Sequence, residues 1–301
     1  MRRHAALALA LIGALAAPIV AASTETSPVV EAEPALATPT TLDRIGRILV
    51  PVMINGQGPF RLMVDTGANR TTITTDVARQ LGLDYATAPT VVLNGVTGSA
   101  SVPAVEVARL RAGDLVLDAQ QVPVVLPHLI SGADGILGVA GLRDKRLIVD
   151  FKRDVVKIAR SQLTAYGPAD GLRIRADRVA GGLLAARVRI GRVRALAVID
   201  TGGQKTLGNR ALQEALRADA RAQATVYGTT EAVSIGDVAA VPDINIDATV
   251  FRNVVVTFGD FHIFDVWSLN EEPALIIGMD VLGAMDTVTI DFRLAEIRLR
   301  S

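Results

Sequence analysis

The sequence predicts a mainly β fold made of two copies of one unit, each a small closed β-barrel with short helices. Three observations support this prediction. An Asp-Thr-Gly triplet occurs twice, an apolar pair followed by glycine comes later in each half, and each half closes on an apolar segment that runs into Asp-Phe. Many short apolar segments lie between glycine-rich turns, a pattern that favours closed sheets or sandwiches over a parallel α/β fold.

Composition narrows the class of protein. The chain has 301 residues, of which half are hydrophobic, and this is enough for about two domains. Its 31 basic and 31 acidic residues cancel, and no basic patch indicates a nucleic-acid partner. The absence of cysteine excludes disulfides, thiol catalysis and thiolate metal sites, and it suits an oxidising compartment.

The N-terminus has the pattern of a secretory signal peptide. Arg2 and Arg3 precede an apolar run over residues 5–17, and small residues follow. This order predicts a signal peptide over residues 1–22, cleaved after Ala22, and a periplasmic or secreted protein. An uncleaved membrane anchor is the alternative, although the run is shorter than the ~20 residues that a spanning helix needs.

Residues 23–44 are rich in Ser, Thr, Glu, Pro and Ala and have no apolar periodicity. This composition predicts a disordered tether between the signal and the folded part. No later hydrophobic stretch reaches spanning length, so we expect no stable membrane span once the signal is removed.

Three motifs recur in the second half of the chain, and each is displaced along the sequence by nearly the same distance. A displacement kept through three motifs indicates an internal repeat. The repeat predicts an N-terminal lobe at residues 45–166 and a C-terminal lobe at residues 167–301. In each motif, the first residue in one lobe matches the first residue in the other. These residues are Asp65 and Asp200 in the triplets, Ile136 and Ile276 in the Ile-Gly elements, and Asp150 and Asp291 in the closing Asp-Phe pairs.

Most of the elements expected in each lobe are strands. Asn94-Gly95 follows a β-branched run and predicts a tight hairpin turn. Runs of apolar and β-branched residues that end at turn signals predict the other strands. The predicted strands cover residues 48–54, 91–95, 102–107, 115–125, 183–190 and 243–258, with closing strands at 147–152 and 288–293.

Two short helices complete the expected secondary structure. The first covers residues 75–81, with Thr75 or Asp76 as its N-cap. The second covers residues 209–216 and is capped by Asn209. Both follow a triplet in the chain, so each lobe is expected to carry one of them.

The two triplets are candidates for catalysis. Each aspartate is fixed at the end of an apolar strand, and the glycine permits the close turn that presents its carboxyl group. Two carboxyl groups about 3 Å apart share one proton, so one can take a proton from water while the other donates to a carbonyl oxygen. Such a pair hydrolyses a peptide bond by general acid–base catalysis, with neither metal nor cofactor. Asp65 and Asp200 are therefore the predicted catalytic residues, and the sequence does not decide which one is the base.

These motifs resemble the retropepsin-like aspartic proteases, in the bacterial-type form that has both lobes in one chain. The resemblance covers residues 48–300 and implies a pepsin-like, two-lobed fold in which Thr66 and Thr201 reach across the lobe interface. It implies that the apolar-apolar-Gly elements complete a psi-shaped loop behind each triplet, and that a glycine-rich hairpin closes over the substrate as a flap. The residues matching the psi-loop element are Ile136, Leu137, Gly138, Ile276, Ile277 and Gly278. The flap candidates are Asn94, Gly95 and Gly98, with Tyr227 and Gly228 as their counterparts in the second lobe.

The residues after the triplets depart from the pepsin pattern. The two active-site loops comprise Thr66, Gly67, Ala68, Thr201, Gly202 and Gly203. Neither Ala68 nor Gly203 offers a hydroxyl group to the ionised carboxylate, and the loss of such a donor raises a carboxyl pKa. We therefore expect a dyad that works at milder pH than pepsin. Alternatively, the Gly203-Gln204 pair distorts the second loop and the protein is inactive.

The predicted function is that of an aspartic endopeptidase which binds an extended extracytoplasmic peptide between its lobes and acts as a monomer. Three alternatives stay open: an inactive peptide-binding protein with the same fold, a dimer in which lobes pair between chains, and a structural envelope protein. His128 and His262 are isolated in the sequence, which favours surface or core positions. The acidic group Asp237, Asp243 and Asp247 lacks the glycine and glutamate of an EF-hand loop, so no metal site is predicted.

Overall fold

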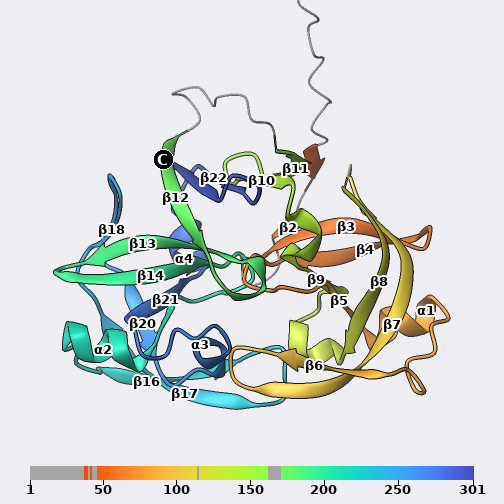
Figure 1. The fold of residues 1–301 in the computed structure, drawn as a ribbon, viewed down its shortest axis with the longest axis horizontal. Helices are drawn as coiled ribbons and strands as arrows, with labels where there is room; N and C mark the ends of the chain where they lie inside the picture. The colour runs from red at the N-terminus through yellow and green to blue at the C-terminus, as the bar shows by residue number, and fades with distance from the viewer. Residues whose placement is uncertain (1–36, 40, 43–45, 114, 162–170) are drawn as a thin grey trace, which may run out of the picture. The chain divides into compact units, whose positions relative to one another are not determined.

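The computed structural model describes residues 37–39, 41–42, 46–113, 115–161 and 171–301. The predicted signal peptide, the first part of the predicted tether and the predicted lobe boundary lie outside the described residues. The described chain is mainly β, with two similar lobes, which confirms the predicted fold class (Figure 1). No helix in the described ranges is long and apolar enough to cross a membrane.

The N-terminal lobe is a closed barrel of six strands. Its strands follow the order β3-β4-β9-β5-β8-β7, and the pairing of β7 with β3 closes the ring. A further strand, β6, forms a hairpin with β7. The bounds are β3 (Ile48–Ile54), β4 (Gln57–Val64), β5 (Thr72–Thr74), β6 (Thr90–Asn94), β7 (Ser99–Ala112), β8 (Leu115–Val125) and β9 (Gly135–Leu137).

The C-terminal lobe repeats this arrangement with one interruption. The long strand β7 corresponds to two short strands, β17 (Val233–Ala240) and β18 (Ile244–Ile246), and β18 is the part that pairs with β13. Pro242 lies in the gap and has no N–H to donate to a ladder. The strand predicted over residues 243–258 is three strands: β18, β19 (Thr249–Phe251) and β20 (Val255–Phe258). They are separated by turns in which Asp247 and Asn253 have positive φ. The remaining strands are β13 (Leu184–Ile190), β14 (Val193–Ile199), β15 (Leu207–Gly208), β16 (Ala222–Tyr227) and β21 (Ala274–Ile277).

Both predicted helices are present, but one cap was predicted wrongly. Helix α1 (Thr75–Gln80) is capped by Thr74, whose hydroxyl accepts from the N–H of Val77. Neither Thr75 nor Asp76 is the cap, because Thr74, the last residue of β5, is the last residue with extended backbone before the helix. Helix α2 (Arg210–Leu216) is capped by Asn209, as predicted. The other short helices are η1 (Pro127–Ile130), η2 (Val139–Leu142), η4 (Ala180–Gly182), α3 (His262–Val266) and α4 (Met279–Leu282).

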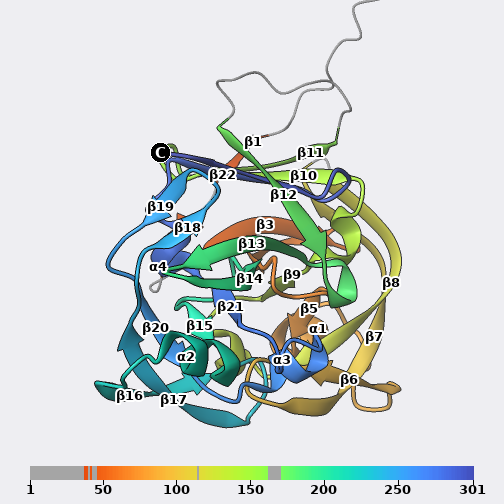
Figure 2. The same cartoon turned by 60° about the vertical axis from the view of Figure 1, so that its left-hand side comes forward.

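The closing strands of the two lobes pair with each other. The strand order β11-β10-β22-β23-β12 makes one sheet from both halves of the chain. Its labelled strands, β10, β11, β12 and β22, lie toward the top of both views (Figure 1 and Figure 2). Its strands are β10 (Lys145–Asp150), β11 (Val155–Arg160), β12 (Leu172–Arg178), β22 (Thr287–Asp291) and β23 (Glu296–Arg300).

Part of the predicted tether belongs to the fold. Strand β1 (Ala37–Pro39) pairs with β11, and β2 (Thr41–Leu42) pairs with β3. The prediction of disorder up to residue 44 is therefore wrong for these two segments. They pair through the backbone with the edges of other strands, although their sequence shows no apolar periodicity.

Candidate active site

Each triplet follows a buried strand that is supported from behind by the later Ile-Gly element. Strand β4 runs parallel to β9, and the N–H of Asp65 donates to the carbonyl of Leu137 at 3.1 Å. In the second lobe β14 runs parallel to β21, and the N–H of Asp200 donates to the carbonyl of Ile277 at 3.0 Å. The structure thus places the predicted psi-loop residues beside both triplets.

The glycine of each supporting element allows the loop after the triplet to approach closely. A Cβ atom at Gly138 would lie 2.5 Å from the carbonyl group of Arg70, and one at Gly278 would lie 2.8 Å from that of Lys205. Because backbone atoms cannot yield as a flexible side chain does, these positions require glycine.

The two aspartates meet at the junction of the lobes. Their side chains lie within hydrogen-bonding reach of each other, Asp65 is half-buried, and Asp200 is 7% exposed. Each triplet glycine lies against the aspartate of the other lobe. A Cβ atom at Gly67 would lie 2.7 Å from Cγ of Asp200, and one at Gly202 would meet the carboxyl group of Asp65. The absence of side chains at both glycines therefore lets the two carboxyl groups come together.

The two loops give their aspartates equivalent backbone donors. The N–H of Gly67 donates to Oδ1 of Asp65 at 2.8 Å, and the N–H of Gly202 donates to Oδ1 of Asp200 at the same distance. The residues at 68 and 203 contribute further backbone N–H groups, and neither contributes a hydroxyl. The Asp-Thr-Gly-Gly loop therefore gives its carboxyl group the two backbone donors that the Asp-Thr-Gly-Ala loop gives, and Asp200 also accepts from the N–H of Gly67.

The surroundings of the pair favour its protonated form. Burial raises the pKa of Asp65 well above its usual range, and the nearby charge and side chain of Asp200 raise it further. Burial also raises the pKa of Asp200, while the side chain of Asp65 and the backbone donors act in the opposite direction. Since the two carboxyl groups titrate as one unit, we describe them as a pair that retains one proton above the ordinary aspartate range.

The two threonines of the triplets join the lobes through four hydrogen bonds. The hydroxyl of Thr66 donates to the carbonyl of Ile199 at 2.6 Å, and that of Thr201 donates to the carbonyl of Val64 at 2.7 Å. Each hydroxyl also accepts from the N–H of the other threonine, at 3.1 and 3.2 Å. Both side chains are buried. The structure therefore has the reciprocal contact that the resemblance implied.

The tips of the two predicted flap hairpins touch each other. The hydroxyl of Thr97 donates to the carbonyl of Ala232 at 2.6 Å. Glycine allows this approach, because a Cβ atom at Gly95 would lie 2.9 Å from Oγ1 of Thr229 and one at Gly228 would lie 2.8 Å from Oγ1 of Thr97.

Other flap candidates differ in their surroundings. A Cβ atom at Gly98 would lie 2.7 Å from Cβ of Ala232, so Gly98 belongs to the tip contact. Tyr227 is 75% exposed, so its side chain is largely free of the tip contact. Asn94 contacts His262, for which the sequence predicts no site role: Nε2 of His262 lies 3.3 Å from Oδ1 of Asn94. The one sequence signal for His262 is that it follows His128 at nearly the displacement of the repeat.

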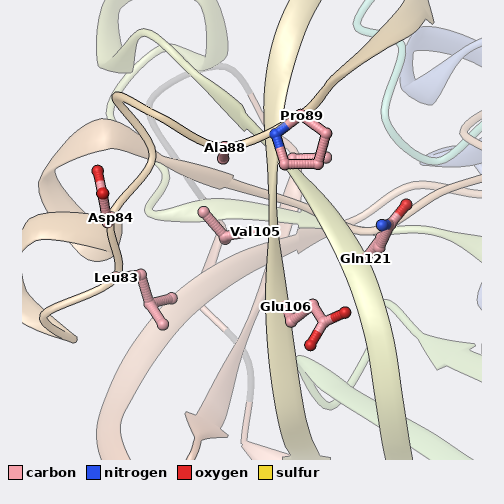
Figure 3. A pocket seen from close by; sticks show the side chains of 8 residues that line it. Leu83, Asp84, Ala88, Pro89, Val105, Glu106 and Gln121 are labelled. Carbon is pink, nitrogen blue, oxygen red and sulfur yellow. The ribbon is translucent and has the colours of Figure 1, made fainter.

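A separate pocket lies on the N-terminal lobe. It has a volume of about 360 Å³ and contains none of the predicted site residues (Figure 3). The carboxyl groups of Asp84 and Glu106 and the amide of Gln121 are its polar groups. Its lining comprises Leu83, Asp84, Ala88, Pro89, Ala104, Val105, Glu106 and Gln121.

Two similar lobes, each placing an aspartate at a shared junction, define the class of two-lobed aspartic-protease folds. The model of the aspartyl protease family matches the chain twice, over residues 50–140 and 185–281, which together make up more than half of its length. The chain therefore belongs to the aspartyl protease family, in a tandem two-lobe form. No curated protein matches the chain at a significant level.

Proposed function

We propose that the protein is an aspartic endopeptidase that hydrolyses extracytoplasmic polypeptides by activating water between Asp65 and Asp200. The approach of the two carboxyl groups across the lobe junction is the observation that carries this proposal. Family membership supports a protease-type activity. The closeness of Asp65 and Asp200 supports these two residues as the ones that carry it out.

In the proposed mechanism the two aspartates hold one proton between them. The ionised carboxylate takes a proton from a bound water molecule, which attacks the peptide carbonyl carbon. The protonated carboxyl group donates its proton to the carbonyl oxygen as the tetrahedral intermediate forms. Collapse of that intermediate breaks the C–N bond, and the carboxyl group that took the proton from water gives it to the leaving nitrogen. A hydroxyl of the intermediate returns a proton to the other carboxylate as the product acid forms, so the pair again holds one proton and no covalent link to the enzyme forms.

The pH range of this mechanism follows from the raised pKa of the pair. Catalysis requires one proton on the two carboxyl groups, so activity is lost when both are protonated and when both are ionised. Burial and the lack of a hydroxyl donor at positions 68 and 203 move this window upward from the ordinary aspartate range. We expect the optimum of kcat/KM to lie above pH 3, and an optimum below about pH 3 would contradict this part of the proposal.

The proposed substrate is an extended peptide that passes between the paired aspartates and the two hairpin tips. Extended peptides bind to sheet edges through backbone hydrogen bonds, and strands β6 and β16 each end a sheet in the described part of the chain. Since one chain carries both aspartates, a monomer is sufficient for activity.

The proposed location is the periplasm or the exterior of the cell, because the sequence begins with a signal-like segment. Mass spectrometry of the protein recovered from the extracytoplasmic fraction is expected to give Ser23 as the first residue. Recovery of the intact N-terminus in the membrane fraction would favour an uncleaved anchor instead.

The activity is tested by incubating the purified protein with a peptide library between pH 3 and pH 8 and identifying products by mass spectrometry. We expect Asp65→Asn and Asp200→Asn each to reduce kcat/KM by on the order of 10² or more. Asp118→Asn is the matched control, because this aspartate lies on the surface of β8 and pairs with exposed Arg109. Full activity of either dyad variant would contradict the mechanism.

A catalytically inactive peptide-binding protein is the second candidate, because both functions use the same fold. The library experiment separates the two candidates. Peptides that bind and stay intact at every pH would favour the binding protein, whereas cleavage that depends on both aspartates favours the endopeptidase.

A further inference from the structure

The two hairpins whose tips touch each other are held in unequal ways. We propose that the second hairpin tip, residues 228–232, is the gate that moves to admit substrate, and that His262 is a positioning residue that keeps the first hairpin tip, residues 94–98, in place. This inference rests on the proposed peptidase function and concerns how substrate reaches its site.

The first hairpin tip is anchored to the opposite lobe by helix α3. The N–H of Ile263 donates to the carbonyl of Val96 at 3.3 Å, and Nε2 of His262 lies 3.3 Å from Oδ1 of Asn94. In both views α3 lies beside β6 (Figure 1 and Figure 2). The first hairpin therefore has a second attachment besides its contact with the other tip.

Helix α3 is itself firmly packed, so it can serve as a fixed support. Phe261 and Phe264 are almost fully buried, with ring centres 6.5 Å apart. Phe264 also packs edge-to-face against Trp267, with ring centres 6.3 Å apart. Because these side chains belong to the hydrophobic core, α3 cannot move with the hairpin without disrupting that core.

The second hairpin tip has a weaker attachment. Among the described residues, the hydrogen bond that holds it to the other lobe comes from the hydroxyl of Thr97. The hydroxyl of Thr230 is buried, with the residue only 4% exposed, and it has no hydrogen-bond partner within the described chain. Tyr227 and Val233, on the strands that lead to this tip, have exposed side chains, so they add little packing to hold it.

The equivalent helix of the first lobe does not supply the missing anchor. Helix η1 occupies the place of α3 in the repeat, and its His128 is exposed. The N–H of Leu129, which corresponds to that of Ile263, donates to Leu126 within its own turn at 3.1 Å. Within the ranges that the structure describes, no hydrogen bond joins η1 to the second hairpin tip.

This difference decides which hairpin opens more readily. Moving either tip breaks the bond between Thr97 and Ala232, but moving the first tip also breaks its two contacts with α3. Each such hydrogen bond changes an opening equilibrium by about fivefold. The second tip is therefore expected to open more often by on the order of 25-fold, and its unpartnered Thr230 hydroxyl gains a partner from water or substrate when it does.

Hydrogen exchange tests this asymmetry without any need for activity. Amides of residues 228–232 are expected to exchange faster than those of residues 94–98. His262→Ala is expected to speed exchange at residues 94–98 by about fivefold, whereas His262→Gln, which keeps a side-chain donor, restores most of the protection. Equal exchange at the two tips, or no effect of His262→Ala, would overturn the proposal.

Cross-linking tests the consequence for turnover, and the absence of native cysteines makes it selective. One variant, Thr97→Cys/Ala232→Cys, allows a short thiol-to-thiol reagent to join the two tips, because Oγ1 of Thr97 already lies 2.6 Å from the carbonyl oxygen of Ala232. The matched variant, Asn94→Cys/His262→Cys, allows the same reagent to join the first tip to α3. Each variant is compared with its own form before cross-linking.

We expect linkage of the two tips to reduce kcat/KM at least 50-fold and linkage of the first tip to α3 to change it less than twofold. Equal losses in both variants would show that the first hairpin must also move, and activity of the tip-linked form would show that the gate need not open. If the parent protein cleaves no peptide, the proposed function fails, and the exchange experiment still decides the gate.

Discussion

At the scale of single residues, the hydroxyls of Thr66 and Thr201 hold the two aspartates in register. Each is buried and takes part in one bond as donor and one as acceptor, and all four bonds cross the lobe junction. Two carboxyl groups in contact repel each other once both are ionised. The reciprocal threonine bonds oppose that repulsion by tying together the backbones on which the aspartates sit.

Replacement of one of these threonines is therefore expected to destabilise the whole protein. Thr66→Val keeps the shape of the side chain but leaves the carbonyl of Ile199 and the N–H of Thr201 without partners, which costs about 1–3 kcal/mol for each buried group. Thr66→Ser retains the hydroxyl and serves as the control. Urea denaturation measures both, and equal stabilities would contradict the assigned role.

The raised pKa of Asp65 predicts a pH-dependent cost to stability. The unfolded-state pKa is about 3.9, and the folded protein holds the proton more tightly, so the free energy of unfolding decreases as pH rises from about 4 through the folded pKa. Asp65→Asn cannot ionise and avoids this loss. We expect the variant to be more stable than the parent at pH 7 by about 0.5–2 kcal/mol, a common gain from relieving a strained site.

The same comparison near pH 3 provides the control for Asp65→Asn. There the side chain of the parent protein is largely protonated in both the folded and the unfolded state, so the stability difference is expected to shrink. Thermal melts across pH 3–8 measure it. A difference that stays constant over this range would show that ionisation of Asp65 is not its cause.

At the scale of secondary-structure elements, the site depends on the ends of β4 and β14, which precede the two aspartates. Strands β9 and β21 support them by parallel pairing. Gly138 is a point of close approach, because a Cβ atom there would lie 2.5 Å from the carbonyl group of Arg70. Gly138→Ala is expected to cost about 1–3 kcal/mol through overpacking and to lower activity by shifting the first triplet. Gly132→Ala is the comparison, since open space surrounds that position and only its positive φ of 84° is strained, at about 1 kcal/mol. Equal effects would argue against the close contact.

Elements defined by local signals could be predicted, and those defined by distant contacts could not. The strand over Ile48–Ile54 and the cap at Asn209 follow from residues within a few positions of each other. The break at Pro242 could be predicted only by knowing that the second-lobe counterpart of β7 runs through that proline, where it divides into β17 and β18. Strands β1 and β2 form by pairing with partners elsewhere in the fold, so their own composition carries no sign of them.

The residues of the site also divide into those that sequence signals predict and those that depend on distant contacts. Asp65 and Asp200 were predicted because the repeat places them at equivalent strand ends, and the structure brings them together. His262 was set aside because a single histidine has no pattern in the sequence. Its contact with Asn94 depends on how one lobe packs against the other, and a local sequence signal does not encode that packing.

At the scale of the whole molecule, the lobes are joined by a shared sheet as well as by the threonines. Strand β10 of the first lobe pairs with β22 of the second, from Arg146 opposite Asp291 to Asp150 opposite Thr287. The hydroxyl of Ser161 also donates to the carboxylate of Asp291 at 2.8 Å. We therefore expect the described lobes to unfold in one cooperative transition.

Calorimetry tests this cooperativity. The calorimetric and van't Hoff enthalpies of unfolding are expected to agree, as they do for a single cooperative unit. A fragment of residues 46–161 is expected to be unstable alone, because β10 and β11 lose their pairing with the second lobe. Two resolved transitions in the intact chain, or a stable isolated fragment, would contradict a shared sheet as the main connection.

The central claim is that Asp65 and Asp200 act as one pair that shares a proton, and carboxyl-carbon NMR of protein labelled at aspartate tests it most directly. The spectra of the parent protein are compared with those of Asp65→Asn and Asp200→Asn between pH 3 and pH 8. We predict that one carboxyl group stays protonated well above pH 4, that its signal belongs to this pair, and that Asp200→Asn lowers the pKa of Asp65 by removing the neighbouring charge. Two independent titrations near the ordinary aspartate value, each unaffected by replacement of the other residue, would contradict the account.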